Sequence, residues 1–150
     1  MLSKSFRIKL WNLWPPFVGA GISIHYVSDD YRHIIAKLKK RWWTLNYRGT
    51  QFGGSMFALT DPFYMVMLIE ILGAEYSVWD KFGSIQYIKP GRTELTAEFI
   101  LKDDDLLGIH KTLEFSDKTD WKFTVEIKDV EGLVVAFVEK IIYIRKKRKE

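Results

Sequence analysis

A long apolar segment, residues 49–72, constrains the fold of this chain more than any other part of the sequence. The segment is too long for a single strand, so its composition predicts a buried helix. A helix that is apolar on all sides must be enclosed by other parts of the protein. One carboxylate, Asp61, stands near the middle of the segment and is followed directly by Pro62. The charge and the helix-breaking proline therefore need a structural or a functional reason.

Several segments around this helix alternate between apolar and polar residues, which is the pattern of strands with one buried face. Residues 22–27 form the first such segment. Residues 33–44 form the second, whose predicted inner residues are Ile34, Ala36, Leu38 and Trp42. Two more segments follow the helix, with predicted inner residues Leu95, Ala97, Phe99 and Leu101 in one, and Trp121, Phe123, Val125 and Ile127 in the other.

The remaining segments complete the predicted outline. Residues 84–90 are expected to form a strand, and residues 133–147, apolar on both sides, a strand buried on both faces. The three aspartates at 103–105 are expected to cap a helical turn. Near the N-terminus, residues 3–14 predict a short amphipathic helix that the two following prolines end.

Length and composition narrow the class of protein. With 150 residues and a hydrophobic content of 47%, the chain suits one domain spanning residues 1–150. The absence of cysteine excludes disulfides and thiolate catalysis and fits a cytoplasmic protein. No apolar run is expected to span a bilayer. The net charge of +4 is carried by the tail, residues 145–150, so the body gives no sign of nucleic-acid binding.

The order of the predicted elements, with Gly53 and Gly54 opening the apolar helix, resembles the hotdog fold. The stretch FGGSMFALTD resembles the motif of thioesterases of the phenylacetyl-CoA type, in which His-Gly-Gly precedes an acidic residue on the helix. Over nearly its whole length the chain is similar to an uncharacterised family of bacterial thioesterase-like hotdog proteins. The resemblance implies an α+β fold, in which an antiparallel sheet of about six strands wraps around one long central hydrophobic helix.

By this resemblance the chain hydrolyses an acyl thioester of coenzyme A or of a carrier protein, with coenzyme A as part of the substrate and no separate cofactor. Asp61 matches the acidic residue of the motif. It would act as a general base on water, or attack the thioester directly and form an anhydride. The backbone N–H groups of Gly53 and Gly54 would stabilise the negative charge that develops on the carbonyl oxygen. Asn46, where such enzymes often carry Asn or Gln, would orient the water or the carboxylate.

Further residues are assigned to substrate binding. Phe52 replaces the motif histidine, with Gln51 beside it. The absence of that histidine argues against dehydration and leaves thioester hydrolysis possible. Lys89 and Arg92, in the stretch YIKPGR, match the strand and turn that such enzymes place beside the coenzyme A nucleotide, and their charges suit phosphates. Asp80 would point into the site from the strand after the helix.

Structural explanations compete with these assignments. Asp61 followed by Pro62 is also the signature of a helix start, with Asp61 as the N-cap. Both interpretations hold if Pro62 kinks a longer helix at Asp61. Asp80 would equally pair with Lys81 at the surface. The three histidines show no ligand spacing, so no metal is predicted.

Two other functions compete with hydrolysis. In the first, the chain is a non-catalytic acyl-CoA binder, in which Asp61 is structural and Phe52 fills the place of the histidine. In the second, the N-terminal helix and the basic tail serve a membrane-peripheral protein, although membrane contact is not expected.

A partner chain is expected, because a sheet of this size leaves an edge and part of the helix uncovered. A homodimer, or a tetramer, is therefore predicted. Gly53 and Asp61 are eight residues apart, which corresponds to about 12 Å along one continuous helix. Because this distance exceeds the span of a thioester carbonyl, the site is predicted to combine Asp61 of one chain with Gly53 of the other.

Overall fold

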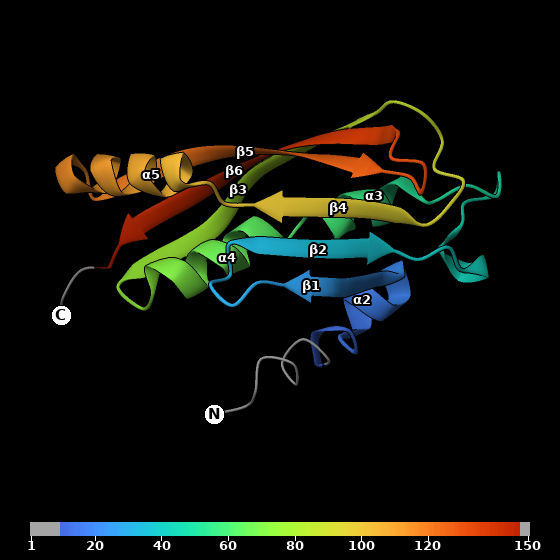
Figure 1. Ribbon diagram of the computed structural model, residues 1–150, viewed down its shortest axis with the longest axis horizontal. Helices are drawn as coiled ribbons and strands as arrows, with labels where there is room; N and C mark the ends of the chain where they lie inside the picture. Colours follow the sequence, from blue (N-terminus) through green and yellow to red (C-terminus); the bar gives the residue numbers. More distant parts are fainter. Residues whose placement is uncertain (1–9, 148–150) are drawn as a thin grey trace.

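The computed structural model describes residues 10–147, and its strands form one antiparallel sheet in the order β1-β2-β4-β5-β6-β3 (Figure 1). The six strands of this described part are β1 (Ile22–Val27), β2 (His33–Leu38), β3 (Tyr76–Tyr87), β4 (Leu95–Ile100), β5 (Lys118–Lys128) and β6 (Val134–Lys146). The inner residues predicted for β4 and most of those predicted for β5 are buried. The antiparallel sheet expected from the sequence is thus confirmed, with β1 and β3 at its two edges.

The central helix consists of two parts, α3 (Gly53–Leu59) and α4 (Phe63–Leu72), which lie against one face of the sheet (Figure 1). Residues 60–62 interrupt the helix, so the predicted kink at Asp61 is present. The N-cap interpretation of Asp61 is wrong, because Pro62 takes the N-cap position of α4 and no side chain caps the helix. The long central hydrophobic helix is confirmed in this kinked form.

Together the two parts make a 20-residue segment, Gly53–Leu72, that is long and apolar enough to cross a bilayer by length and composition alone. The sequence-based expectation that no run reaches this length is therefore wrong. In the structure, 44% of the most apolar window of this segment is buried inside the protein. The buried side chains include Leu59, Phe63, Met67 and Leu68, which pack into the core under the sheet.

The strand predicted over residues 33–44 is shorter than expected. β2 ends at Leu38, and a short 3₁₀ helix, η1 (Trp42–Thr44), follows it. The side chain of Trp42 is 85% exposed instead of lying on the inner face. The prediction fails because the chain leaves the sheet before Trp42, so period-2 alternation no longer assigns a face.

The first described residues are anchored on the edge strand β1. The sequence predicts that a helix ends at Pro15 and Pro16. Helical residues 10–11 do precede the prolines, and the prolines themselves begin a second helix, α2 (Pro15–Ala20), because a proline in the first helical turn needs no N–H partner. Residues 3–9 of the helix predicted over 3–14 lie outside the described residues. The side chain of Asn12 donates to the carbonyl of Ile24 at 3.2 Å and accepts from its N–H at 2.7 Å. These two bonds satisfy backbone groups at a sheet edge.

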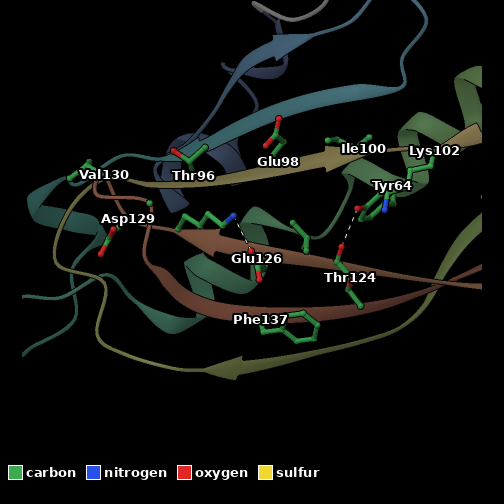
Figure 2. Close-up of a pocket in the computed structure, with 13 residues that line it drawn as sticks. Tyr64, Thr96, Glu98, Ile100, Lys102, Thr124, Glu126, Asp129, Val130 and Phe137 are labelled. Atoms are coloured by element: carbon green, nitrogen blue, oxygen red, sulfur yellow. Dashed lines mark hydrogen bonds and ion pairs between the residues drawn. The ribbon is translucent and has the colours of Figure 1, made fainter.

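The strands β4 and β5 pair over a short length and then diverge. They are paired only at Thr96–Lys128 and Ala97–Ile127, and α5 (Asp103–Phe115) connects their far ends. The helical turn predicted at the three aspartates is therefore a full helix. A pocket of about 530 Å³ lies over the gap, lined mainly by outward side chains of β4 and β5 (Figure 2).

Tyr64 of α4 contacts both strands. Its hydroxyl donates to the carbonyl of Thr124 on β5 at 3.2 Å (Figure 2), and its ring lies edge-on to Phe99 of β4, with centroids 5.4 Å apart. The ring stacks on Phe123, with centroids 4.2 Å apart. Burial raises the pKa of Tyr64 to about 12, so the phenol stays neutral and keeps its proton for Thr124.

Replacing Tyr64 with phenylalanine is expected to lower the free energy of unfolding by about 1 kcal/mol, because the ring packing remains while the carbonyl of Thr124 loses its hydrogen-bond donor. Urea denaturation followed by circular dichroism measures the change. Tyr47→Phe is the matched control, since the Tyr47 side chain is 94% exposed, and it should leave the midpoint unchanged. Equal midpoints for both variants would show that this hydrogen bond contributes nothing to stability.

Candidate active site

Asp61 occupies the break between α3 and α4, with its side chain 67% exposed. Its backbone N–H donates to the carbonyl of Ala58 at 3.2 Å, so the main chain at the break is tied to α3. The ammonium of Lys140 donates to Oδ1 of Asp61 at 3.2 Å. The carboxylate is thus held in place at one oxygen and remains open to solvent and to a ligand.

Lys140, on β6, is buried with its side chain 2% exposed. Its ammonium lies 2.7 Å from Oδ1 of Asp80 on β3 and 5.9 Å from the ring centre of Phe57. Within residues 10–147, Oδ1 of Asp80 has no hydrogen bond apart from this ion pair. A buried ammonium without counter-ions would be costly, so the two carboxylates and the aromatic face account for its presence here.

A β-bulge at Lys81 brings Gly83 to the face of the sheet that Asp80 and Lys140 share. Asp80 precedes the extra residue, and Gly83, the cross-strand partner of Lys140, follows it. Cross-strand partners project to one face, and the bulge shifts the alternation of β3 by one residue. At Gly83 a Cβ atom would lie 3.0 Å from the Phe57 ring and 3.3 Å from the Lys140 side chain. The bulge and the glycine together make room for the buried lysine.

Burial raises the pKa of the Asp80 carboxyl above its ordinary value, while the Lys140 ammonium opposes the rise and the charge of Asp61 adds to it. A raised pKa means that the folded state holds this proton more tightly than the unfolded state. The contribution of Asp80 to stability is therefore largest below its unfolded pKa and declines as the pH rises through its folded pKa.

The alternative prediction for Asp80, a surface ion pair with Lys81, is wrong. Lys81 instead forms an ion pair with Asp120 at 2.5 Å.

Gly53 and Gly54 open α3, and each has a neighbour that excludes a side chain. The hydroxyl of Tyr87 donates to the carbonyl of Gly53 at 2.9 Å, and a Cβ at Gly53 would lie 2.8 Å from that hydroxyl. A Cβ at Gly54 would collide with the ring of Phe52. The first N–H groups of a helix have no carbonyl partner inside it. Those of the two glycines are therefore donors available to a ligand.

Two pockets meet at Gly54. The first, called here the α3 pocket, has a volume of about 570 Å³, and its lining includes Asn46, Gln51, Phe52, Gly53, Gly54 and Lys89. The second, called the Asp61 pocket, has a volume of about 270 Å³, and its lining includes Gly54, Phe57, Ala58 and Asp61. One chain thus brings Asp61 and Gly54 to the same pocket, whereas Gly53 lines only the α3 pocket. The site shared between two chains stays a prediction.

The polar side chains of Asn46 and Gln51 bind their own chain. Asn46 donates to the hydroxyl of Thr50 at 2.9 Å and accepts from the N–H groups of Arg48 and Thr50, so it shapes the loop before α3. Gln51 is buried and donates to the carbonyl of Thr93 at 3.0 Å. Its Oε1 has no hydrogen-bond partner among the described residues. Neither side chain forms a hydrogen bond with Asp61 in the described part of the chain.

Of the two basic residues assigned to coenzyme A, Lys89 lines the α3 pocket and Arg92 does not. Lys89 forms an ion pair with Asp129 at 2.8 Å. Arg92 is exposed, three residues further along the chain. Phe52 is 55% exposed, at the N-cap position of α3.

In the described residues no group of three His, Cys, Asp or Glu side chains is arranged to hold a metal ion.

Lys140 is the residue of this site that the sequence prediction misses. Residues 133–147 predict a strand apolar on both faces, and Lys140 stands within it at the same parity as Val138 and Ile142. A lysine on the inner face of a buried strand requires a carboxylate partner, and this rule is the signal that points to it. Nothing in the sequence chooses that partner.

Comparisons with known proteins bear on the fold and the family. A family model described as "Domain of unknown function (DUF4442)" matches residues 3–144. A Pseudomonas aeruginosa protein of unknown function, described as a probable thioesterase, has a TM-score of 0.82 at 15% identity, with 97% of each chain covered. A Haemophilus influenzae thioesterase has a TM-score of 0.69 at 13% identity, with 100% of this chain and 95% of that chain covered.

A hypothetical thioesterase from Streptococcus pneumoniae, whose structure contains coenzyme A, has a TM-score of 0.59 at 21% identity, with 85% of this chain and 91% of that chain covered. No curated protein matches the chain. At these identities the likeness establishes the fold, a hotdog fold, and any argument about activity rests on the residues of the site.

Proposed function

Because the chain belongs to the DUF4442 family and has a thioesterase-like hotdog fold, we propose that it hydrolyses the thioester bond of an acyl-coenzyme A or acyl-carrier substrate. The observation that carries this proposal is the Asp61 pocket. There an exposed carboxylate, held by a buried lysine, shares a cavity with Gly54 at the start of a helix. These are the two groups that thioester hydrolysis requires, a base and a donor for the developing oxyanion.

In the proposed reaction Asp61 takes a proton from a water molecule while the water oxygen bonds to the thioester carbon. The carbonyl oxygen becomes negative and accepts a hydrogen bond from the backbone N–H group of Gly54, which lines the same pocket as Asp61. The carbon–sulfur bond then breaks, the proton goes to the thiolate, and the products are a carboxylic acid and the free thiol. Direct attack by Asp61, through an anhydride that water then cleaves, gives the same products.

Lys140 is proposed to position Asp61 for this step. Its ammonium fixes one oxygen of the carboxylate at 3.2 Å, which limits the rotation of a side chain that is otherwise exposed. Asp80 provides a second counter-charge for the buried ammonium, 2.7 Å away. A base held within a fraction of an ångström of its working position contributes to rate through orientation.

The α3 pocket is proposed to receive the coenzyme A moiety, with Lys89 on its wall and the exposed Arg92 three residues further along the chain as the basic groups for its phosphates. Support comes from Gly54, which lines both this pocket and the Asp61 pocket, and from the structural neighbour that was solved with coenzyme A.

A homodimer is also proposed. The strand β3 lies at a sheet edge, and Trp79 and Phe82 on it are 64% and 52% exposed, so a second chain would cover an unpaired, partly apolar edge.

The proposal is tested by incubating the purified protein with a panel of acyl-coenzyme A thioesters and an acyl-carrier protein. Release of free thiol, followed with a thiol-reactive dye, should rise in proportion to protein concentration for at least one substrate. Binding of the same thioesters without any thiol release would favour the alternative of a non-catalytic acyl-CoA binder. Absence of both binding and turnover across the panel would overturn both.

A further inference from the structure

We propose that a second, apolar pocket next to Asp61 holds the acyl group, and that the substrate is therefore an uncharged apolar acyl thioester; this inference rests on the function proposed above. The pocket, called here the α4 pocket, has a volume of about 390 Å³. Its lining consists of Trp11, Trp14, Phe17, Pro62, Phe63, Met65 and Val66. None of these side chains is charged, and the volume lies in the range of small-ligand pockets, about 300–1,000 Å³.

The α4 pocket continues directly from the Asp61 pocket. Trp14, Phe17 and Pro62 line both cavities, and Pro62 is the residue next to Asp61 in the chain. A thioester carbonyl beside Asp61 and Gly54 would therefore have the α3 pocket on one side and the α4 pocket on the other. This order matches the order of groups in an acyl-coenzyme A: the nucleotide and pantetheine arm, the thioester, and the acyl chain.

The wall of the α4 pocket is held in place by specific contacts. The two hydrogen bonds between Asn12 and the backbone of Ile24 anchor the segment that carries Trp11 and Trp14. Trp14 packs on Phe17 with ring centroids 5.2 Å apart, and Phe17 packs on Phe63 at 5.9 Å. Because these side chains are already ordered in the free protein, binding of a ligand does not have to supply the free energy that ordering them would cost.

The chemistry of this lining selects against charge. A carboxylate or ammonium on the acyl chain would lose its hydration in the pocket without gaining a partner there. An alkyl chain gains about 0.8 kcal/mol for each methylene it buries, which corresponds to about a fourfold increase in affinity per methylene. Affinity should therefore rise with chain length until the α4 pocket is full, and a chain ending in a carboxylate should lose this gain.

The experiment measures the affinity of the full chain for S-alkyl-coenzyme A thioethers by calorimetry. Thioethers keep the coenzyme A and the chain but are not hydrolysed, so the result does not depend on turnover. Chains of two to eight carbons, and matched chains ending in a carboxylate, are compared. We expect affinity to rise about fourfold per methylene over the shorter chains, with no rise for the carboxylate series.

Two variants test whether the alkyl chain binds in the α4 pocket. Val66→Phe, which adds volume to the lining, should make affinity stop rising at a shorter chain length, and Trp14→Ala should reduce the gain per methylene. Trp42→Ala is the control, because this exposed tryptophan lies outside the α4 pocket, and it should retain the wild-type slope. Melting temperatures of the three variants establish that each is folded.

A flat dependence of affinity on chain length in the wild type would overturn the inference and would indicate that another part of the protein, or a second copy of the chain, covers this pocket. An unchanged slope in both pocket variants would overturn it as well. A clear slope in a protein that releases no thiol would leave the acyl pocket standing and would reject only the proposed hydrolysis.

Discussion

Asp61→Asn is expected to lower kcat/KM for acyl-coenzyme A hydrolysis by about two to four powers of ten, the loss associated with an essential acid–base group. Asparagine has nearly the same shape as aspartate, and its Oδ1 can still accept the hydrogen bond from Lys140. Its amide cannot take a proton from water or attack a carbonyl. The effect should therefore fall on the rate of reaction, with the affinity for S-alkyl-coenzyme A unchanged.

The stability of this variant separates a catalytic role from a structural one. The Asp61 side chain is 67% exposed, and Lys140 retains Asp80 as a counter-ion, so the melting temperature should change little. Asp104→Asn is the matched control, since Asp104 is an exposed carboxylate on α5, outside both pockets. Turnover by Asp61→Asn at the wild-type rate would reject Asp61 as the catalytic group.

The second large effect is expected from Lys140→Met. Methionine approximates the length of the lysine chain and removes the ammonium, which leaves Asp80, with its side chain 22% exposed, without a counter-ion. Removal of one partner of a buried ion pair costs about 3–5 kcal/mol of folding free energy. Urea denaturation monitored by circular dichroism should therefore show a markedly lower midpoint than in the wild type.

The double variant Lys140→Met with Asp80→Asn distinguishes a role of Lys140 in stabilising the fold from a role in positioning Asp61. Removing the stranded carboxylate should restore much of the lost stability, and the coupling between the two sites follows from the double-mutant cycle. Activity should not return, because Asp61 still lacks the ammonium that fixes it, and the loss should appear in kcat more than in KM. Full activity in the stabilised double variant would limit Lys140 to a structural role.

The alternation of apolar and polar residues in β4 and β5 is enough to predict which of their side chains face the core. Leu95, Ala97 and Phe99 are buried as predicted, since a period of two leaves each residue of a regular strand only two faces to choose from. The apolar segment after Gly53 likewise requires enclosure, and the proline at position 62 indicates the kink. Patterns of this kind depend on neighbours in sequence, so the sequence alone suffices to read them.

The sequence pattern predicts the wrong element at Trp42 and misses the helix that begins at Pro15 and Pro16, and each of these positions lies where an element begins or ends. The same local pattern fits a strand that continues and a strand that stops, and tertiary packing decides between the two. Proline is equally compatible with the end of one helix and the first turn of the next. Propensities restrict what a residue can do at such positions, and the choice follows from contacts with distant parts of the chain.

The candidate site shows the same division. From the sequence alone, the spacing of Gly53, Gly54 and Asp61 matches the thioesterase motif, and Pro62 indicates the break in the helix. The partnership of Asp61 with Lys140 joins residues 79 positions apart. A single bulged residue on β3 places both Asp80 and Gly83 on the face of the sheet that Lys140 occupies, which leaves room for the lysine beside its second carboxylate. A bulge is set by how two strands fit together. That fit is a property of the folded sheet, so only the tertiary structure decided which carboxylates would hold the buried charge.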